Sequence, residues 1–158
     1  MVLMHLSATT LLAALCLIGT CDCSSSFDRD KWVSNTDAND QHNPRAKMVN
    51  DVIQHHLKVG MSRAEVLALL GKPYSDGIQQ RLPKATVLPD SVSITSSDNL
   101  KPENIDKALA RFNAYYRSHA RPDTLMLYPV GWSIIDPNFL AVEFNGKGTV
   151  QAYWVEEH

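Results

Sequence analysis

Cysteine is absent from most of this sequence. The 158 residues contain three cysteines, Cys16, Cys21 and Cys23, and none follows them. Residues 24–158 therefore cannot form an internal disulfide, a thiolate metal site or a cysteine nucleophile. A chain of this length has room for one domain with accessory segments, and we expect packing alone to hold that domain together.

An excess of charge of either sign is also missing. Fifteen Lys and Arg residues stand against 17 Asp and Glu residues, which gives a formal net charge of -2. Proteins that bind DNA or RNA usually collect their Lys and Arg side chains on one face. Here the two signs are interspersed along the chain, so we predict no nucleic-acid partner.

The sequence has no apolar run long enough to cross a bilayer comfortably. Residues 11–19 are apolar over a length typical of the hydrophobic part of a signal peptide. They lead into Ile18-Gly-Thr-Cys21, which resembles the lipobox of bacterial lipoproteins. The resemblance implies a signal peptide over residues 1–20, cleavage before Cys21 and lipid attachment to its thiol. The protein would then be anchored on the periplasmic side of the cell envelope.

Two further outcomes of export stay open. Ordinary cleavage near Cys23 or Ser24 gives a soluble periplasmic or secreted protein, and retention of the segment as a membrane helix is the third possibility. Asp22 resembles an inner-membrane retention signal, so the choice between inner and outer membrane is also open.

The segment that follows is rich in Ser, Asp and Asn. Between Asp22 and Pro44, Trp32 and Val33 form the bulky apolar pair. Such a composition does not bury enough surface to fold. We therefore predict that residues 21–45 form the lipidated cysteine and a flexible tether.

Glycines mark the ends of two predicted helices. Gly60 and Gly71 suit the left-handed residue that follows a helix, and Pro73 prevents the second helix from continuing. Ser62 and Glu65 have the spacing of a capping box, which starts that second helix. The first helix, over residues 46–59, places five side chains on one face: Val49, Val52, Ile53, His56 and Leu57.

Alternation of apolar and polar residues predicts three strands near the C-terminus. Pro129 in the first strand indicates an edge position or a bulge, and the glycines of residues 145–148 suit a hairpin turn. The fold class is therefore α+β, with two short N-terminal helices packed on a three-stranded antiparallel meander. The side chains expected to face the core are Met126, Tyr128, Val130 and Trp132, then Leu140, Val142 and Phe144, then Val150, Ala152 and Trp154.

Residues 79–122 are predicted to be an insertion with a loop and a third helix. The loop includes a short strand candidate near Val92 and Ile94. Basic residues near the helix end, such as Arg117 and Arg121, favour either contact with anionic lipid headgroups or an acidic partner, or a solvated helix end. The apolar stripe of the helix is Ile105, Leu109, Phe112 and Tyr116.

The helix pair and the later hairpin resemble the BamE-like (SmpA/OmlA) lipoproteins, which are small components of outer-membrane protein assembly. The similarity covers residues 46–78 and 124–156. It implies a BamE-like α+β domain over residues 46–158 and a membrane-anchored, non-catalytic scaffold or binding lipoprotein whose partners are envelope or membrane proteins. The positions that carry the resemblance are Gly60, Met61, Ser62, Glu65, Val66, Leu69, Leu70, Gly71, Pro73, Trp132, Phe144 and Gly146.

The sequence offers little catalytic chemistry. His55 and His56 would point about 100° apart on a helix, which does not suit one metal ion. Asp136 lies in a predicted turn and Glu143 on the outward side of a strand, so we do not expect them to pair. The sequence lacks a nucleophile elbow and a phosphate-binding glycine loop. We therefore predict no catalytic residues, no metal and no cofactor.

A second function fits the same pattern. A helix pair followed by a sheet resembles the repeat of secreted β-lactamase inhibitor proteins, whose sheet faces the target enzyme. This resemblance implies a secreted or tethered inhibitor, or an immunity-type protein-binding module.

Overall fold

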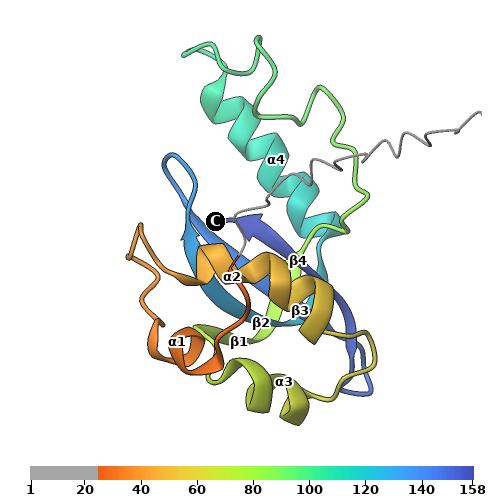
Figure 1. The fold of residues 1–158 in the computed structure, drawn as a ribbon. Helices are drawn as coiled ribbons and strands as arrows, with labels where there is room; N and C mark the ends of the chain where they lie inside the picture. The colour runs from red at the N-terminus through yellow and green to blue at the C-terminus, as the bar shows by residue number, and fades with distance from the viewer. Residues whose placement is uncertain (1–24) are drawn as a thin grey trace, which may run out of the picture.

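The computed structural model describes residues 25–158, so the predicted signal peptide and Cys21 lie outside the described residues. The described chain folds into one antiparallel sheet with the strand order β1-β2-β3-β4 and with helices on one face and beyond one end (Figure 1). The elements are α1 (Arg29–Ser34), α2 (Arg45–Asp51), a π-helical turn η1 (Val52–His56), α3 (Arg63–Leu70), β1 (Ser75–Arg81), α4 (Ile105–His119), β2 (Arg121–Trp132), β3 (Pro137–Phe144) and β4 (Val150–Glu157).

The predicted combination of helices and an antiparallel sheet is confirmed, but the sheet has four strands rather than three. The additional strand, β1, pairs with β2 along its whole length, from Ser75 opposite Leu127 to Arg81 opposite Arg121. Its sequence is polar apart from Ile78, whose side chain is 71% exposed at the sheet edge. A strand with no apolar alternation gives no periodic signal, and for this reason the sequence did not reveal it.

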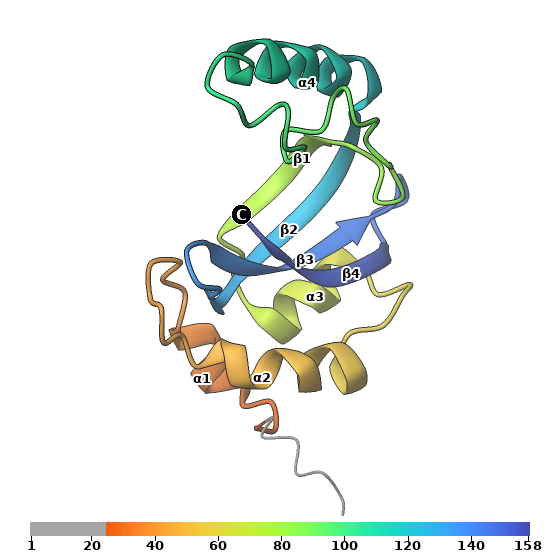
Figure 2. The same ribbon diagram turned by 90° about the horizontal axis from the view of Figure 1, so that it is seen from above.

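Helices α1, α2 and α3 cover one face of the sheet, and α4 lies at the opposite end of the molecule (Figure 2). The main core lies between these three helices and the sheet. No helix in residues 25–158 is both long and apolar enough to cross a membrane. The fully buried core side chains include Trp32, Val52, Val66, Leu70, Met126, Tyr128, Leu140 and Val142.

The predicted flexible tether is wrong from residue 25 onward. Asp28 caps α1 by accepting a hydrogen bond from the Lys31 amide at 3.0 Å, and the helix buries Trp32 completely in the main core. The Arg45 Nε atom donates to the Trp32 carbonyl oxygen at 2.7 Å and so links α1 to α2. Polar composition suggested disorder, but burying one large indole outweighs that tendency because it removes a large apolar area from water.

The second predicted helix is confirmed at both ends, whereas the first ends at His56 in a π-helical turn rather than at Val59. Gly60 and Gly71 have positive φ angles of 94° and 73°. Ser62 and Glu65 form a full capping box, in which the Ser62 amide donates to the Glu65 carboxylate at 2.7 Å and the Ser62 hydroxyl accepts from the Glu65 amide. Val66 and Leu70 of α3 are thereby directed into the core.

Of the two alternatives predicted at Pro129, an edge position or a bulge, the bulge is present. The pairing of β2 with β3 shifts between Pro129 and Trp132. Met126, Tyr128 and Val130 face the main core as expected, but Trp132 follows the bulge and is not part of that core. Its indole N–H donates instead to the Ala38 carbonyl oxygen at 2.8 Å.

A second register shift corrects the predicted orientation of β4. Phe144 pairs with Val150, whereas Glu143 pairs with Ala152, so one extra residue lies between the two pairs. A bulge of this kind reverses the alternation beyond it. Val150 faces the main core, but Ala152 and Trp154 lie on the other face of the sheet with Glu143. Their predicted inward positions are therefore wrong.

The insertion is shorter than predicted at both ends. Residues 79–81 belong to β1, and Arg121 and Pro122 belong to β2. The segment around Val92 and Ile94 forms turns rather than a strand. The predicted helix is present as α4, but Leu109 on its apolar stripe is 44% exposed.

We expect Trp32→Ala to lower the free energy of unfolding by about 3–5 kcal/mol, because it empties a large buried site. Denaturant unfolding monitored by circular dichroism measures the change. Trp32→Phe is the matched control and should cost less, because the buried Trp32 indole N–H has no hydrogen-bond partner among the described residues. A flexible tether would predict no change for either variant.

Gly71→Ala should lower the free energy of unfolding by about 1 kcal/mol or more beyond the loss caused by Gly60→Ala. Both positions have positive φ, which an added Cβ disfavours. At Gly71 the new Cβ would also lie 3.0 Å from a Val33 methyl group, whereas at Gly60 it would meet nothing within 4 Å. Equal melting temperatures for the two variants would contradict the packing of α1 against the end of α3.

Candidate binding notch

The candidate site lies on the sheet face that α1–α3 leave uncovered, which we call the distal face. Strand register places Arg81, Asp123, Glu143 and Trp154 on this face. Its centre is a small second core formed by Leu127, Phe139 and Ala141, with Ala38 and Trp154 packed against it. The charged residues lie beside this second core.

An ion pair joins the two outer strands across the distal face. Both terminal nitrogens of Arg81 on β1 donate to the Glu156 carboxylate on β4, at 2.7 and 2.5 Å. The Trp154 indole N–H and the His158 ring add hydrogen bonds to the same carboxylate at 2.5 and 2.6 Å. We call this pair, Arg81 with Glu156, the edge clamp.

The clamp changes the acidity of Glu156. Burial raises the pKa of this carboxyl, but the hydrogen bonds from Arg81, His158 and Trp154 outweigh burial and lower the pKa to about 2. The hydrogen bond to Glu156 likewise raises the pKa of Arg81. Both groups are therefore charged throughout the neutral range. The clamp is a bidentate, charge-assisted ion pair, which is stronger than a neutral hydrogen bond.

The segment after β1 crosses the distal face from one edge of the sheet to the other. Lys84, three residues beyond the end of β1, places its ammonium nitrogen 3.1 Å from the centroid of the Trp154 ring on β4. The Arg81 guanidinium lies 5.5 Å from the same ring. Partial burial lowers the pKa of Lys84, against the opposing effect of Glu143 and Glu156. Trp154 thus receives two cations, an arrangement that its electron-rich ring face stabilises.

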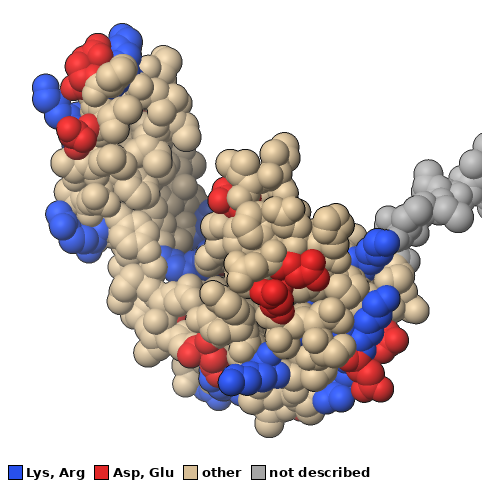
Figure 3. Space-filling model, turned by 90° about the vertical axis from the view of Figure 1, so that its left-hand side faces the viewer, with Lys and Arg blue, Asp and Glu red and all other residues tan. Residues whose placement is uncertain are grey.

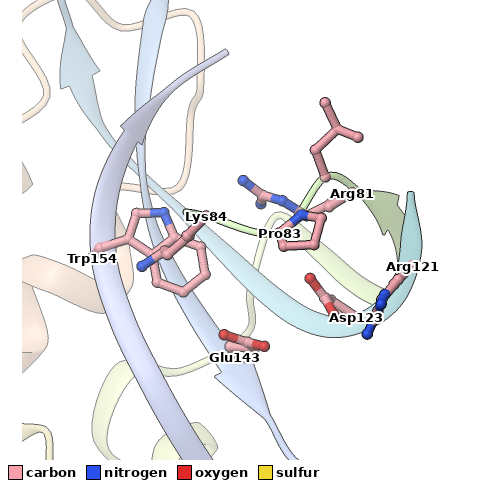
Figure 4. A pocket seen from close by; sticks show the side chains of 8 residues that line it. Arg81, Pro83, Lys84, Arg121, Asp123, Glu143 and Trp154 are labelled. Carbon is pink, nitrogen blue, oxygen red and sulfur yellow. The ribbon is translucent and has the colours of Figure 1, made fainter. Parts of the chain in front are cut away.

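These side chains enclose a pocket of ≈260 Å³ between the crossing segment and the sheet (Figure 4). Asp123 and Glu143 project from β2 and β3 and are half-buried, whereas Lys84 and Arg121 are exposed at the rim. The residues that line the pocket are Arg81, Leu82, Pro83, Lys84, Arg121, Asp123, Glu143 and Trp154.

Residues 85–119 form an arm that stands out from the body and leaves a notch between them (Figure 3). The Tyr116 hydroxyl on α4 donates to the Gln80 carbonyl oxygen and holds the base of the arm to β1. Arg111 fastens the loop to α4 by donating to the Ser91 carbonyl oxygen at 2.7 Å and to the Asn99 side chain at 2.8 Å. The arm is therefore an ordered element rather than an unstructured loop.

Two further hollows belong to the notch and the arm. One, of ≈360 Å³, lies between the arm base and the end of β4 and is lined by Gln80, Tyr116 and His158 among others. The other, of ≈180 Å³, lies within the arm and is almost entirely apolar. Its lining residues are Ile94, Asn99, Leu100, Ile105, Ala108 and Leu109.

The residues that carry the family resemblance do not line the Arg81–Trp154 pocket. They build the opposite layer: Val66, Leu70 and Phe144 belong to the main core, and Met61 and Leu69 pack against it. Gly71 and Pro73 line a separate shallow hollow of ≈400 Å³ at the end of α3. Gly146 lies in the β3–β4 turn and Cys21 lies outside the described residues. The motif residues therefore shape the scaffold rather than the notch.

Sequence reasoning missed the pocket residues because they come from distant segments. Arg81 and Glu156 are 75 positions apart, and no spacing rule joins them. The bulge in β4, which the sequence did not reveal, is what brings Trp154 to this face. Asp136 stays in the β2–β3 turn beside Ser133, so it does not pair with Glu143.

The two adjacent histidines converge on one carboxylate instead of diverging. In the π-helical turn, the His55 and His56 rings lie 2.7 and 3.3 Å from the two oxygens of Asp51. The backbone N–H of Phe27, foremost, and the hydrogen bond from His55 lower the pKa of Asp51. Within residues 25–158 no group of three or more His, Cys, Asp or Glu side chains is placed to hold a metal ion. The cluster fastens Phe27, near the start of the described chain, to the end of α2.

Comparison with protein-family models, with curated proteins and with solved structures found no match.

The clamp predicts that stability falls as acid is added. The folded pKa of Glu156, about 2, is below its ordinary value of 4.5, so its contribution is present above pH 4.5 and is lost as the pH falls toward 2. We expect Glu156→Gln to cost about 2 kcal/mol at neutral pH and to flatten the stability profile between pH 4.5 and 2.

Urea unfolding at a series of pH values measures this profile. Glu157→Gln is the matched control, because Glu157 is the exposed neighbour on the same strand. An equal effect from both variants would show that net charge, rather than the clamp, sets the acid sensitivity.

Proposed function

We propose that this protein is a membrane-anchored, non-catalytic binding lipoprotein of the bacterial cell envelope. It presents the notch between arm and body to a protein partner, in a role accessory to outer-membrane protein assembly. The observation that carries the proposal is the division of the sheet into two faces. Helices α1–α3 seal one face, whereas the distal face has an ordered arm, a charged pocket and exposed apolar side chains (Figures 2 and 3).

The anchor favours an orientation in which the notch points away from the membrane. The described chain begins on the helix layer, where the Ser25 amide donates to the Lys47 carbonyl oxygen of α2 at 2.9 Å. A lipid on Cys21 would be four residues from this point, a reach of at most about 14 Å. The helix layer would then lie near the bilayer, with the arm at the far end of the domain (Figure 2).

The surface of the arm favours a protein partner over a lipid headgroup. Ile94, Leu100, Ile105 and Leu109 are all at least 39% exposed although they surround one apolar hollow. Such grouped apolar side chains on an exported protein are typical of protein-interaction sites. The end of the arm carries acidic as well as basic side chains (Figure 3), so an anionic surface would be repelled as well as attracted.

The pocket supports a binding role more than a catalytic one. Its described lining contains carboxylates and cations but no Ser, Thr, Cys or His side chain. A hydroxyl or thiol nucleophile with an adjacent histidine base is therefore not assembled in that lining.

Photo-crosslinking in living cells tests the docking surface. A photoreactive residue at Leu109, on the arm, should capture outer-membrane assembly components. The same residue at Val59, which is exposed between η1 and α3 on the helix layer, should not. Crosslinks from Val59 alone, or none from a functional protein at either position, would contradict the proposal. Capture of one soluble enzyme from Leu109 would instead support the inhibitor or immunity function.

The anchor is tested in the same cells. Cys21→Ser should move the protein from the membrane fraction to the soluble fraction, because the thiol that carries the lipid is gone. Cys23→Ser is the matched control and should stay with the membrane. Release of both variants, or of neither, would contradict attachment at Cys21.

A further inference from the structure

Four charged side chains around the Arg81–Trp154 pocket have no opposite charge within ion-pair distance in the described part of the chain. They are Lys84, Arg121, Asp123 and Glu143; the clamp residues nearby are paired with each other. Glu143 accepts one hydrogen bond, from Gln151 at 2.6 Å. The pocket therefore holds two carboxylates and two cations that form no close ion pair. Asp123 attracts Arg81, and Glu143 attracts Lys84, only at longer range.

The two signs are separated by depth. Glu143 pairs in register with Leu125, which makes Asp123 its diagonal neighbour on the same face. Such neighbours are roughly 7–8 Å apart at their Cα atoms. Asp123 and Glu143 are half-buried, whereas Lys84 and Arg121 are exposed and lie on opposite sides of the pocket (Figure 4). Like charges this close on one face are unfavourable until a cation lies between them.

We infer that this pocket binds a small zwitterion, with its ammonium group between Asp123 and Glu143 and its carboxylate at Lys84 and Arg121. The Trp154 indole forms the apolar wall along which the methylene groups of such a ligand pack. The volume of ≈260 Å³ is smaller than the 300–1,000 Å³ or so of pockets for drug-sized molecules. The ligand class is therefore an amino acid or the charged end of a short peptide.

This inference goes beyond the proposed function and does not depend on it. The pocket is built by the sheet and the crossing segment, whereas the apolar side chains that the crosslinking experiment tests lie on the arm. A negative crosslinking result would not contradict ligand binding in the pocket, and a negative ligand titration would not contradict partner binding at the arm.

A ligand titration of the full chain, purified in detergent, tests the inference. The probes are glycine, 4-aminobutanoate and 6-aminohexanoate, which carry the same two charges at increasing separation. Pentylamine and hexanoate carry one charge each and are the controls. The readout is the NMR signal of the Trp154 indole N–H, which Trp154→Phe identifies among the three tryptophans.

We expect saturable binding in the millimolar range or tighter, with one amino acid at least about tenfold tighter than both single-charge controls. If pentylamine bound as tightly as the amino acids, the carboxylates alone would account for binding, and the inference would be overturned. No saturable change with any probe would overturn it as well.

Two substitutions locate the charges. Asp123→Asn should raise the dissociation constant of the preferred amino acid about tenfold, because a charge-assisted contact to the ammonium group is lost. Asp136→Asn, in the β2–β3 turn, is the matched control and should change nothing. Lys84→Met should weaken binding of the amino acid but leave binding of pentylamine unchanged. General unfolding would weaken both. Thermal unfolding of each variant confirms that the fold is intact.

The source of the zwitterion is resolved by two tripeptides. Gly-Gly-Lys has its side-chain ammonium and terminal carboxylate on one residue, and its amidated form lacks the carboxylate. Binding of the free-acid peptide as tightly as lysine would identify a chain end as the ligand. Binding of lysine alone would identify a free amino acid.

Discussion

The contact between the two outer strands organises the distal side of this protein. Arg81 on β1 and Glu156 on β4 are separated by two intervening strands, yet their side chains form a bidentate ion pair. Accumulated strand twist brings the ends of β1 and β4 together over the distal face, where the C-terminus lies near β1 (Figure 2). The pocket is the space enclosed beneath this contact. The arm begins where the clamped strand ends.

A single extra residue decides which side chains reach that space. Between the Phe144–Val150 and Glu143–Ala152 pairs the alternation of β4 reverses. Without the bulge, Trp154 and Glu156 would face the helices, where a carboxylate would be buried in an apolar core at high cost. With the bulge, the same two residues supply the pocket wall and half of the clamp. One extra residue in a strand thus separates the face that packs on the helices from the face that carries the pocket.

The sequence predicted the features that depend on local chemistry. The glycines at 60 and 71, the capping box of Ser62 and the bulge after Pro129 are all present, because each satisfies a backbone requirement within a few residues. Features that depend on distant packing were not predictable. Trp32 lies in a polar segment and is ordered by the core it enters. Strand β1 is ordered by pairing with β2 rather than by its own pattern. The pocket joins segments on either side of the arm, so no local rule reveals it.

The clamp also links the distal face to the completion of folding. Its partners are 75 positions apart, so the loop that joins them is among the longest to close, and contacts of this separation form slowly. The final strand also completes the main core, because it supplies Val150 and Tyr153. The pocket gains Trp154 only when that strand docks. The pocket is therefore complete only once the whole domain has assembled, because its lining comes from both sides of the arm.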